Sequence, residues 1–221
     1  AGLGGGPPVG PRRWALVVAE RCCFRLLAGP AALVGRASLE KWPTGSGKTL
    51  AVGIRRVGQR GRDSARPEAL GLVPTRELAI QVAEEVGSFA KAKGLHVALA
   101  YGGTPVISQA KRLKGAHVVV ATPGRLQDLI ERKLVSLAGI RILVLDEADR
   151  MLDMGFRPQV EKILRSVPKE RQTMLFSATL DGEVGELADS YTNDPARFEA
   201  LREISNDDGV ILHHFVSVTP D

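Results

Sequence analysis

The sequence predicts an open, mostly parallel α/β sheet with crossover helices, and three observations support this fold class. Five short runs between residues 69 and 176 are almost wholly apolar in their centres, as expected of strands buried on both faces. Longer amphipathic stretches separate these runs, which is the alternation typical of βαβ units. Residues suited to binding phosphate or metal follow the ends of the runs, where ligands bind in open α/β sheets.

The elements follow from these patterns. The predicted strands are Ala69 to Val73, His96 to Tyr101, His117 to Ala121, Ile142 to Leu145 and Thr173 to Phe176. The clearest helix is predicted from Arg76 to Lys93, because apolar residues recur there at helical spacing and charged residues fill the other face. Gly94 follows in the position of a C-terminal cap. We expect helices on both faces of the sheet.

The composition indicates a globular chain. Hydrophobic residues make up 44% and charged residues 25% of the 221 positions, so the chain can bury a core and is not a disordered tail. No apolar run reaches the roughly 20 residues that span a bilayer, because Glu20, Arg21 and Arg25 interrupt the one candidate, and no membrane partner is expected. A formal net charge of +5 is compatible with a polyanionic partner.

The cysteines indicate the compartment. Cys22 and Cys23 are adjacent in sequence and cannot easily form a disulfide with each other, so a reducing compartment and a cytoplasmic location are expected. The four histidines show no spacing typical of a zinc site.

A glycine-rich segment is the first candidate for chemistry. Its residues are Thr44, Gly45, Ser46, Gly47, Lys48 and Thr49. Glycines let backbone N–H groups surround a phosphate chain, Lys48 places a charge against the outer phosphates, and the Thr49 hydroxyl can ligate Mg²⁺. An ordinary turn before a helix is the alternative interpretation of this segment alone.

An acidic cluster is the second candidate. The apolar run Ile142 to Leu145 leads into Asp146 and Glu147, which would direct Asp146 toward a metal ion and Glu147 toward a water that attacks the γ-phosphate. Alone, such a cluster is more often a solvated turn. Together with the glycine-rich segment it supplies complementary parts of one Mg²⁺-nucleotide site.

The segment Asp146 to Asp149 spells Asp-Glu-Ala-Asp, and the chain resembles the DEAD-box ATP-dependent RNA helicases, especially the bacterial members. Further motifs occur in the family's order, at Pro74 to Ala79, Gly102-Gly103, Thr122 to Arg125, and Ser177 to Thr179. The resemblance covers roughly residues 43–221. It implies a RecA-like P-loop domain, the first of two, that binds ATP and Mg²⁺ and grips RNA by its sugar-phosphate backbone.

The resemblance also implies residue roles. Lys48 and Thr49 would hold phosphates and metal, Asp146 the metal, and Glu147 the attacking water. Residues that would couple hydrolysis to strand separation are Asp149, Ser177, Ala178 and Thr179. Residues that would bind single-stranded or duplex RNA are Pro74, Thr75, Arg76, Gly102, Gly103, Thr122, Pro123, Gly124 and Arg125.

The chemistry of the RNA segments agrees with this implication. Hydroxyls, guanidinium groups and exposed backbone N–H groups suit phosphate and ribose rather than base edges, so contacts should be independent of sequence and sensitive to salt. Singly, each segment could also be a helix start, a loop turn or a strand-to-helix connection. The arginine-rich stretch from Arg55 to Arg66 is better interpreted as a solvated loop, because no aromatic residue is interleaved for stacking.

Upstream of Pro43 the sequence departs from the family. Residues 1–42 form an atypical or disordered segment and contain neither Gln nor Thr, which the adenine-recognising segment would supply. Trp42 stands where the family has a small residue, and residues 37–41 are predicted to make a poor central strand because Glu40 and Lys41 would be costly to bury. A displaced reading frame or an eroded copy is one hypothesis for this contrast.

Three functional classes remain open. The leading one is an RNA helicase represented by its N-terminal ATPase domain, with the domain at residues 43–205 and the start of an interdomain linker at residues 206–221. The second RecA-like domain is not expected within this sequence, so weak or no unwinding is expected of this polypeptide alone. The alternatives are a catalytically silent nucleotide- or RNA-binding remnant and a P-loop ATPase that acts on another substrate such as DNA.

Overall fold

A computed structural model of the chain describes residues 37–41, 66–192 and 194–199. Within them, seven parallel strands form one sheet in the order β3-β4-β2-β5-β6-β1-β7. The strands are β1 Ser38–Lys41, β2 Ala69–Leu72, β3 Val97–Ala100, β4 Val118–Ala121, β5 Ile142–Leu145, β6 Gln172–Ser177 and β7 Ala196–Glu199. The predicted parallel sheet is confirmed, and each of the five predicted strands overlaps an observed one.

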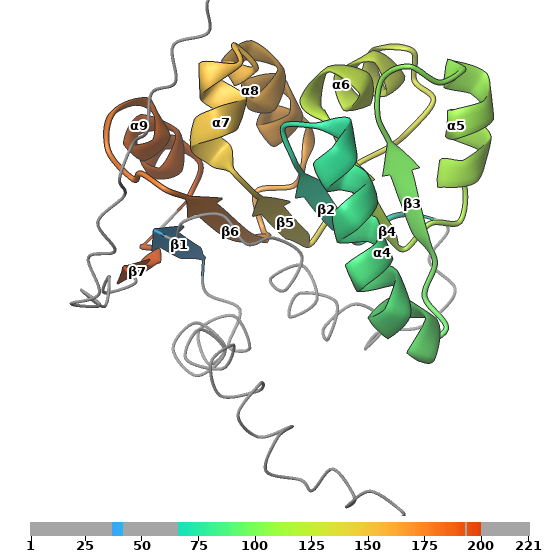
Figure 1. Cartoon of the computed structure of the whole chain (residues 1–221), viewed down its shortest axis with the longest axis horizontal. Coiled ribbons are helices and arrows are strands. Elements are labelled where there is room, and N and C mark those ends of the chain that lie inside the picture. The colour runs from blue at the N-terminus through green and yellow to red at the C-terminus, as the bar shows by residue number, and fades with distance from the viewer. Residues whose placement is uncertain (1–36, 42–65, 193, 200–221) are drawn as a thin grey trace, which may run out of the picture.

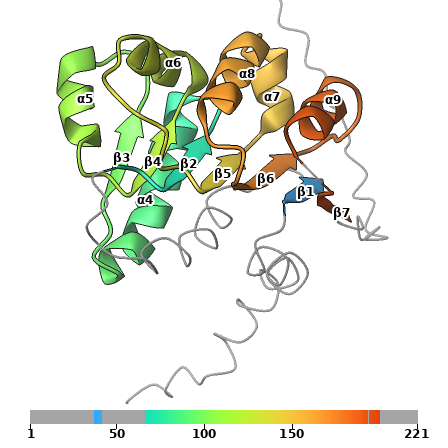
Figure 2. The same ribbon diagram turned by 180° about the vertical axis from the view of Figure 1, so that it is seen from behind.

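Helices connect the strands and cover both faces of the sheet (Figures 1 and 2). They are α4 Arg76–Ala92, α5 Val106–Leu113, α6 Pro123–Glu131, α7 Ala148–Asp153, α8 Arg157–Ser166 and α9 Gly182–Tyr191. Buried residues of α5 to α9 belong to one apolar cluster, and those of α4 belong to a second. Among the described helices, α4 therefore covers one face of the sheet and the other five cover the opposite face.

The strands are buried because their side chains alternate between these two clusters. In β2, Leu70 and Leu72 pack with α5 to α9, while Ala69 packs with α4. In β5, Leu143 and Leu145 belong to the first cluster in the same way. Apolar side chains on both faces explain why these runs contain almost no polar residues.

Helix α4 begins and ends close to the predicted positions. The Oγ1 of Thr75 accepts a hydrogen bond from the backbone N–H of Leu78 at 3.2 Å, which caps the first turn. After the last turn Gly94 has φ 69°, a left-handed conformation that favours glycine. The prediction of a helix over this segment is confirmed.

The prediction that residues 37–41 make a poor central strand is wrong. Strand β1 lies between β6 and β7 and pairs with both in parallel. Ser38 and Leu39 are buried, and Lys41 stands at the end of the strand with its side chain only partly buried. Pairing with β6 and β7 satisfies the backbone N–H and C=O groups of β1. The position of Lys41 at the strand end reduces the free-energy cost of burying its charge. A boundary at residue 43 would therefore separate β1 from its sheet.

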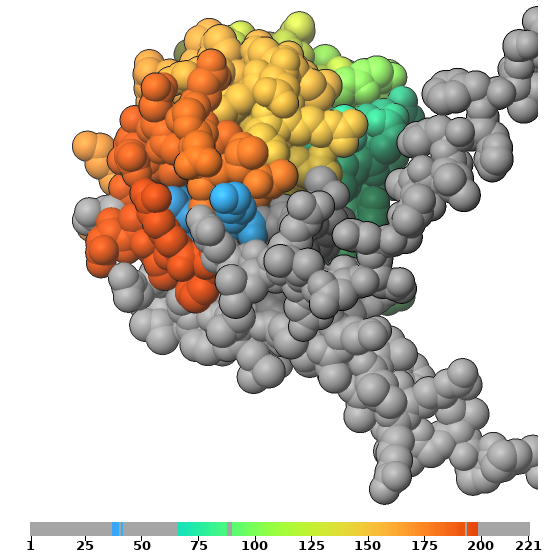
Figure 3. Space-filling view, turned by 60° about the vertical axis from the view of Figure 1, so that its left-hand side comes forward, coloured from blue at the N-terminus to red at the C-terminus, as the bar shows by residue number. Residues whose placement is uncertain are grey.

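Strand β1 is visible at the surface beside β7 in the space-filling view (Figure 3).

Within the described ranges, no helix combines the length and the apolar character needed to cross a bilayer.

The central packing can be tested at Leu143, which is fully buried in β5. Leu143→Ala should lower the free energy of unfolding by about 2–5 kcal/mol, because the cavity forms between the sheet and the helices that cover this face. Urea denaturation followed by circular dichroism measures this change. Met154→Ala is the matched control, since Met154 is 49% exposed. Equal stability of the two variants would contradict the described core.

Candidate functional site

The carboxyl ends of three neighbouring strands, β5, β6 and β1, lie at one edge of the sheet. β5 pairs with β6 through Leu145 and Leu175, and β6 pairs with β1 through Ser177 and Lys41. Because all three strands are parallel, the segments that follow them start at the same edge. Asp146 follows β5 directly, and the predicted phosphate-binding segment follows Lys41. Residues 44–49 themselves lie outside the described residues.

Asp146 is positioned by its own backbone. Its N–H donates to the carbonyl of Leu72 at 2.9 Å, which joins the end of β5 to the end of β2. One carboxylate oxygen of Asp146 accepts the N–H of Glu147 at 3.1 Å. Asp146 is partly buried. A carboxylate held at a strand end in this way suits a metal ligand.

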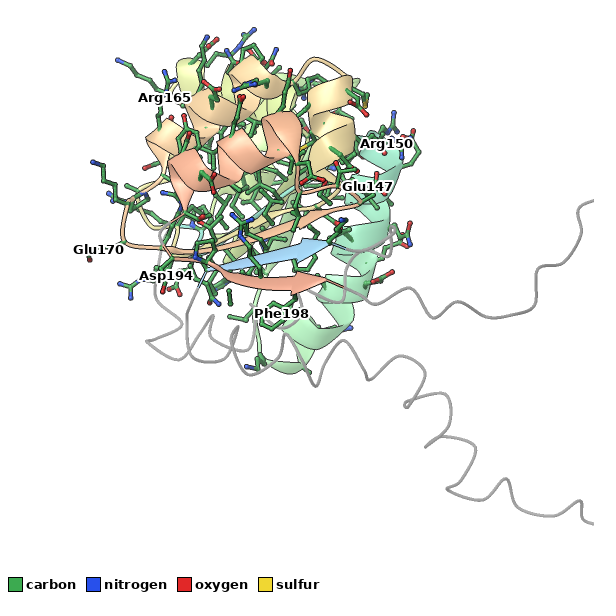
Figure 4. All side chains as sticks on the ribbon, turned by 90° about the vertical axis from the view of Figure 1, so that its left-hand side faces the viewer. Glu147, Arg150, Arg165, Glu170, Asp194 and Phe198 are labelled. Atoms are coloured by element: carbon green, nitrogen blue, oxygen red, sulfur yellow. The ribbon has the colours of Figure 1, made fainter. Side chains whose placement is uncertain are left out.

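Glu147 has an unusual backbone conformation. Its φ of 52° and ψ of 53° place it in the left-handed region, which costs a non-glycine residue about 1–2 kcal/mol. Such outliers cluster at functional sites, where the surrounding structure maintains them. The side chain is buried, and its carboxylate accepts from the Arg150 guanidinium at 3.0 Å. Figure 4 shows the two side chains close together near the sheet edge.

Asp149 and Ser177 connect the ends of β5 and β6. The N–H of Asp149 donates to the Ser177 hydroxyl at 3.3 Å, and the N–H of Ala178 donates to the Asp149 carboxylate at 3.0 Å. The N–H of Thr179 also donates to the Ser177 hydroxyl, at 3.4 Å. Ser177 is buried, whereas Ala178 and Thr179 are exposed. A movement of one strand end therefore changes the hydrogen bonds of the other.

The donor set fits Mg²⁺ bound with a nucleotide. Among the described residues no group of three or more His, Cys, Asp or Glu side chains could form an all-protein metal site. Mg²⁺ at phosphate sites commonly takes only one or two protein carboxylates and completes its shell with phosphate oxygens and water. The Asp146 carboxylate has the chemistry that such a site requires.

The predicted RNA-binding residues lie at the same edge, beyond β2, β3 and β4. Pro74 is buried, and Thr75 caps α4 as described above. The guanidinium of Arg76 lies over the ring of Tyr101, 4.9 Å from its centroid. Gly102 and Gly103 follow Tyr101 and are exposed, and Gly103 has φ 85°. The structure thus brings together the first two predicted RNA segments.

The third predicted RNA segment begins α6. The N–H of Thr122 donates to the carbonyl of Ala100 at 2.9 Å, and Pro123 is buried at the start of the helix. The Thr122 side chain makes no capping hydrogen bond to the helix. Gly124 is exposed, and the space where a side chain would stand is open. A helix start with an exposed glycine and a hydroxyl is suited to a phosphate group.

Arg125 makes protein contacts that the sequence did not predict. Its Nη1 donates to the Thr104 carbonyl at 2.9 Å and to the Gln109 carboxamide oxygen at 2.8 Å. The Gln109 amide in turn donates to the Tyr101 carbonyl at 3.2 Å and to the Thr104 hydroxyl at 3.0 Å. Arg125 therefore positions the loop that contains the two glycines, whether or not it also touches RNA.

Gln109, Thr104 and Tyr101 are the site residues that sequence reasoning missed. Gln109 lies on α5 and is 5% exposed. Because a buried glutamine needs hydrogen-bond partners, its position could have indicated a polar contact there. Tyr101 was predicted only as the end of a strand. Its contact with Arg76 joins residues 25 positions apart and leaves no local pattern in the sequence.

The geometry agrees with comparisons to known proteins. Residues 26–187 match the family model of the DEAD/DEAH box helicases. The chain belongs to this family. The match begins upstream of Pro43, where the sequence resemblance alone was expected to begin, and it includes β1.

Named relatives support the assignment. The chain is 49% identical over 183 residues to DEAD-box ATP-dependent RNA helicase 52A of Oryza sativa subsp. japonica. This match covers 73% of this chain and 30% of the relative. It is 43% identical over 180 residues to the DEAD-box ATP-dependent RNA helicase CshA of Streptococcus pneumoniae serotype 4, covering 80% and 34% respectively. The chain thus spans about a third of the length of these relatives.

A solved structure confirms the RecA-like fold. The crystal structure of a DEAD box protein from Methanococcus jannaschii superposes with a TM-score of 0.71 at 41% identity, covering 77% of this chain and 47% of that one. The expected α/β class, sheet and family are all confirmed.

Arg125→Ala should loosen the loop of residues 102–104. Removing a charged hydrogen-bond donor leaves the Thr104 carbonyl and the Gln109 side chain without that partner, so amide exchange in the loop should rise about tenfold or more. Hydrogen exchange measured by mass spectrometry or NMR detects this. Arg132→Ala is the control, because Arg132 follows the last residue of α6, has a side chain that is 58% exposed, and pairs with Asp128 of the same helix. Unchanged exchange in Arg125→Ala would contradict the positioning role.

Proposed function

We propose that this chain is the N-terminal ATPase domain of an ATP-dependent RNA helicase, which binds Mg-ATP and the RNA backbone and couples hydrolysis to duplex unwinding when a second RecA-like domain is present. The observation that carries the proposal is the shared edge of β5, β6 and β1. Asp146 and Glu147 follow β5 at that edge, and Lys41, the last residue of β1, precedes the predicted phosphate-binding segment in the sequence.

The nucleotide roles follow from residue chemistry. Lys48 would neutralise the outer phosphates, while Thr49 and Asp146 would provide oxygen ligands for Mg²⁺, and the bound ion would offset charge on the phosphates. The backbone N–H groups of Thr44, Gly45, Ser46 and Gly47 would complete the cradle. Glu147 would hold and deprotonate the attacking water, and its buried carboxylate suits this task because it is already fixed in direction.

Coupling would pass through the hydrogen bonds between the ends of β5 and β6. Asp149 lies two residues after Glu147 and contacts both Ser177 and Ala178. A change at the γ-phosphate that moves Glu147 would therefore alter the contacts of Ser177 and Thr179. This arrangement supports the coupling role that the resemblance implies for the Ser177 to Thr179 segment.

RNA would lie across the glycine loop and the start of α6. Gly102, Gly103, Gly124 and Arg76 are exposed there, and Thr122 is partly buried. They offer backbone N–H groups, a guanidinium group and a hydroxyl. These groups match phosphate and ribose and read no base code. A cytoplasmic location and the second domain as partner remain predictions.

A catalytically silent remnant is the second candidate. Trp42, which stands where the family resemblance predicts a small residue, favours it, and this residue lies outside the described part of the structure. A chain that binds ATP and RNA without turnover would belong to this class.

Glu147→Gln should separate binding from chemistry. The variant should bind Mg-ATP about as well as the parent and lose ATP hydrolysis by about 10²-fold or more, because the amide cannot accept the proton of the attacking water. Single-turnover hydrolysis with RNA present and a fluorescent ATP analogue measure the two properties.

Lys48→Ala is the matched comparison for that experiment and should lose ATP affinity with little change in stability, since a lysine predicted to bind phosphate is not expected to contribute to the apolar core. A parent chain that binds ATP but never hydrolyses it would support the remnant. Parental hydrolysis by Glu147→Gln would contradict the assigned base.

RNA affinity should be independent of sequence and sensitive to salt. Oligo(U) and a mixed-sequence RNA of equal length should bind with similar affinity, and both affinities should fall about tenfold between roughly 50 and 200 mM salt, because the contacts go to phosphates. Fluorescence anisotropy measures these values, with matched DNA as the control ligand. Tighter binding of DNA would favour the alternative P-loop ATPase. A strong preference for one base sequence would contradict backbone recognition.

A further inference from the structure

An open groove runs along the β3 edge of the sheet, away from the candidate nucleotide site. Strand β3 is the last strand at this side of the described sheet, with β4 as its neighbour. Helix α4 lies on one side of β3 and α5 on the other, as Figure 1 shows. The groove has a volume of about 700 Å³ and is lined by residues of α4, β3, α5 and the loop between β3 and α5.

The backbone of β3 has hydrogen-bonding groups directed into this groove. The carbonyl of His96 accepts a hydrogen bond from the N–H of Val118 in β4, and the carbonyl of Ala100 accepts one from the N–H of Thr122. The backbone groups of His96 and Ala100 therefore point toward β4. Backbone direction alternates along a strand, and the N–H and C=O groups of Val97 and Leu99 therefore face outward. An extended peptide can pair with such groups as an added strand.

The side chains of the groove leave room for an extended peptide. On α4, Ile80, Ala83 and Gly87 line the groove at helical spacing, and Ala83 and Gly87 are small. A Cβ built on Gly87 would meet nothing within 4 Å. Val97 and Leu99 are only partly buried and add apolar surface beside them. Alternate side chains of an added strand would meet this surface.

The charge at one end of the groove indicates the chemistry of the partner. Lys91 on α4 and Arg112 on α5 both line the groove and are exposed. Both lie in the last turns of their helices, near the amino end of β3. One acidic residue, Glu84, lines the middle of the groove. A second copy of this chain would bring like charges together, whereas an acidic segment would be attracted.

We propose that the groove between α4 and α5 binds an extended, apolar peptide segment of a partner protein, with acidic residues near Lys91 and Arg112, as an added strand beside β3. Recognition would come from main-chain hydrogen bonds to Val97 and Leu99, apolar contacts with α4, and the two cations. RNA fits this surface less well, because an apolar helix stripe and a strand edge offer few groups for phosphates.

The groove also reaches the loop near the RNA site. Thr104 and Gln109 line the groove beside the loop that follows β3, and both accept hydrogen bonds from Arg125. A peptide that contacts them would alter the support of the glycine loop. Partner binding and RNA binding are therefore expected to influence each other, and this part of the inference rests on the proposed RNA function.

The probe for the test is a fluorescein-labelled peptide of about eight residues that alternates Glu and Val, with a Lys and Val peptide as its charge-reversed control. The whole chain should bind the acidic peptide and slow amide exchange at Val97 and Leu99, while Ala98 and Ala100, already paired with β4, should change little. Equal binding of both peptides, or binding without protection of Val97 and Leu99, would overturn the proposal.

Two variants locate the site. Gly87→Leu adds a side chain whose Cβ meets nothing within 4 Å and raises helix propensity, so it should keep the fold, occupy part of the groove and weaken peptide binding about tenfold or more. Ala92→Leu adds an exposed leucine on the same helix outside the groove and should bind like the parent. Arg112→Glu should also weaken binding, whereas Lys111→Glu, with the same charge change beside the groove, should not.

Several outcomes would refute the groove as a peptide site. Parental affinity in Gly87→Leu would show that the peptide binds elsewhere. Loss of oligo(U) affinity in Gly87→Leu, with peptide binding unchanged, would assign the groove to RNA instead. Because the peptide titration needs neither ATP nor RNA, its failure is distinguishable from failure of the proposed helicase function.

Discussion

The parallel pairing of β5, β6 and β1 is the constraint on which the candidate nucleotide site depends. The register sets Leu145 beside Leu175 and Lys41 beside Ser177, so the chain leaves all three strands at one edge. Asp149, Ser177 and Ala178 then fasten two of these strand ends together through hydrogen bonds. Apolar packing on both faces holds the strands in register, because a slip by one residue would turn each buried side chain to the opposite face.

The left-handed conformation of Glu147 depends on the same constraint. Asp146 is fixed by its hydrogen bond to Leu72, and α7 begins immediately after Glu147. One residue must therefore turn the chain between a buried strand and a buried helix. Backbone strain of this kind persists where the surroundings determine it, and here the Glu147 carboxylate is held by the Arg150 guanidinium at 3.0 Å.

The RNA side of the edge depends on long-range side-chain contacts rather than on strand ends alone. Arg125 from α6 holds Thr104 and Gln109, and Arg76 from α4 lies over Tyr101. Three separate segments thus support one glycine loop. Truncating any of these side chains is therefore expected to disturb the loop.

Local patterns in the sequence predicted most of this architecture. Apolar runs marked the five strands from β2 to β6, and helical spacing marked α4, because burial on two faces or one leaves a periodic signal. The same patterns missed β1, since Glu40 and Lys41 argued against burial while pairing on both sides decided the outcome. Motifs predicted Asp146, Glu147, Asp149 and Ser177, whereas the partners of Arg125 come from distant segments that no local pattern connects.

The most direct test of the account is a crystal structure of this chain with Mg²⁺ and a non-hydrolysable ATP analogue. The account predicts that the phosphates lie beyond the carboxyl ends of β5, β6 and β1, with Lys48 against the outer phosphates and the Asp146 carboxylate coordinating Mg²⁺ directly or through water. A nucleotide bound elsewhere on the sheet, or a metal ion that does not involve Asp146, would contradict it.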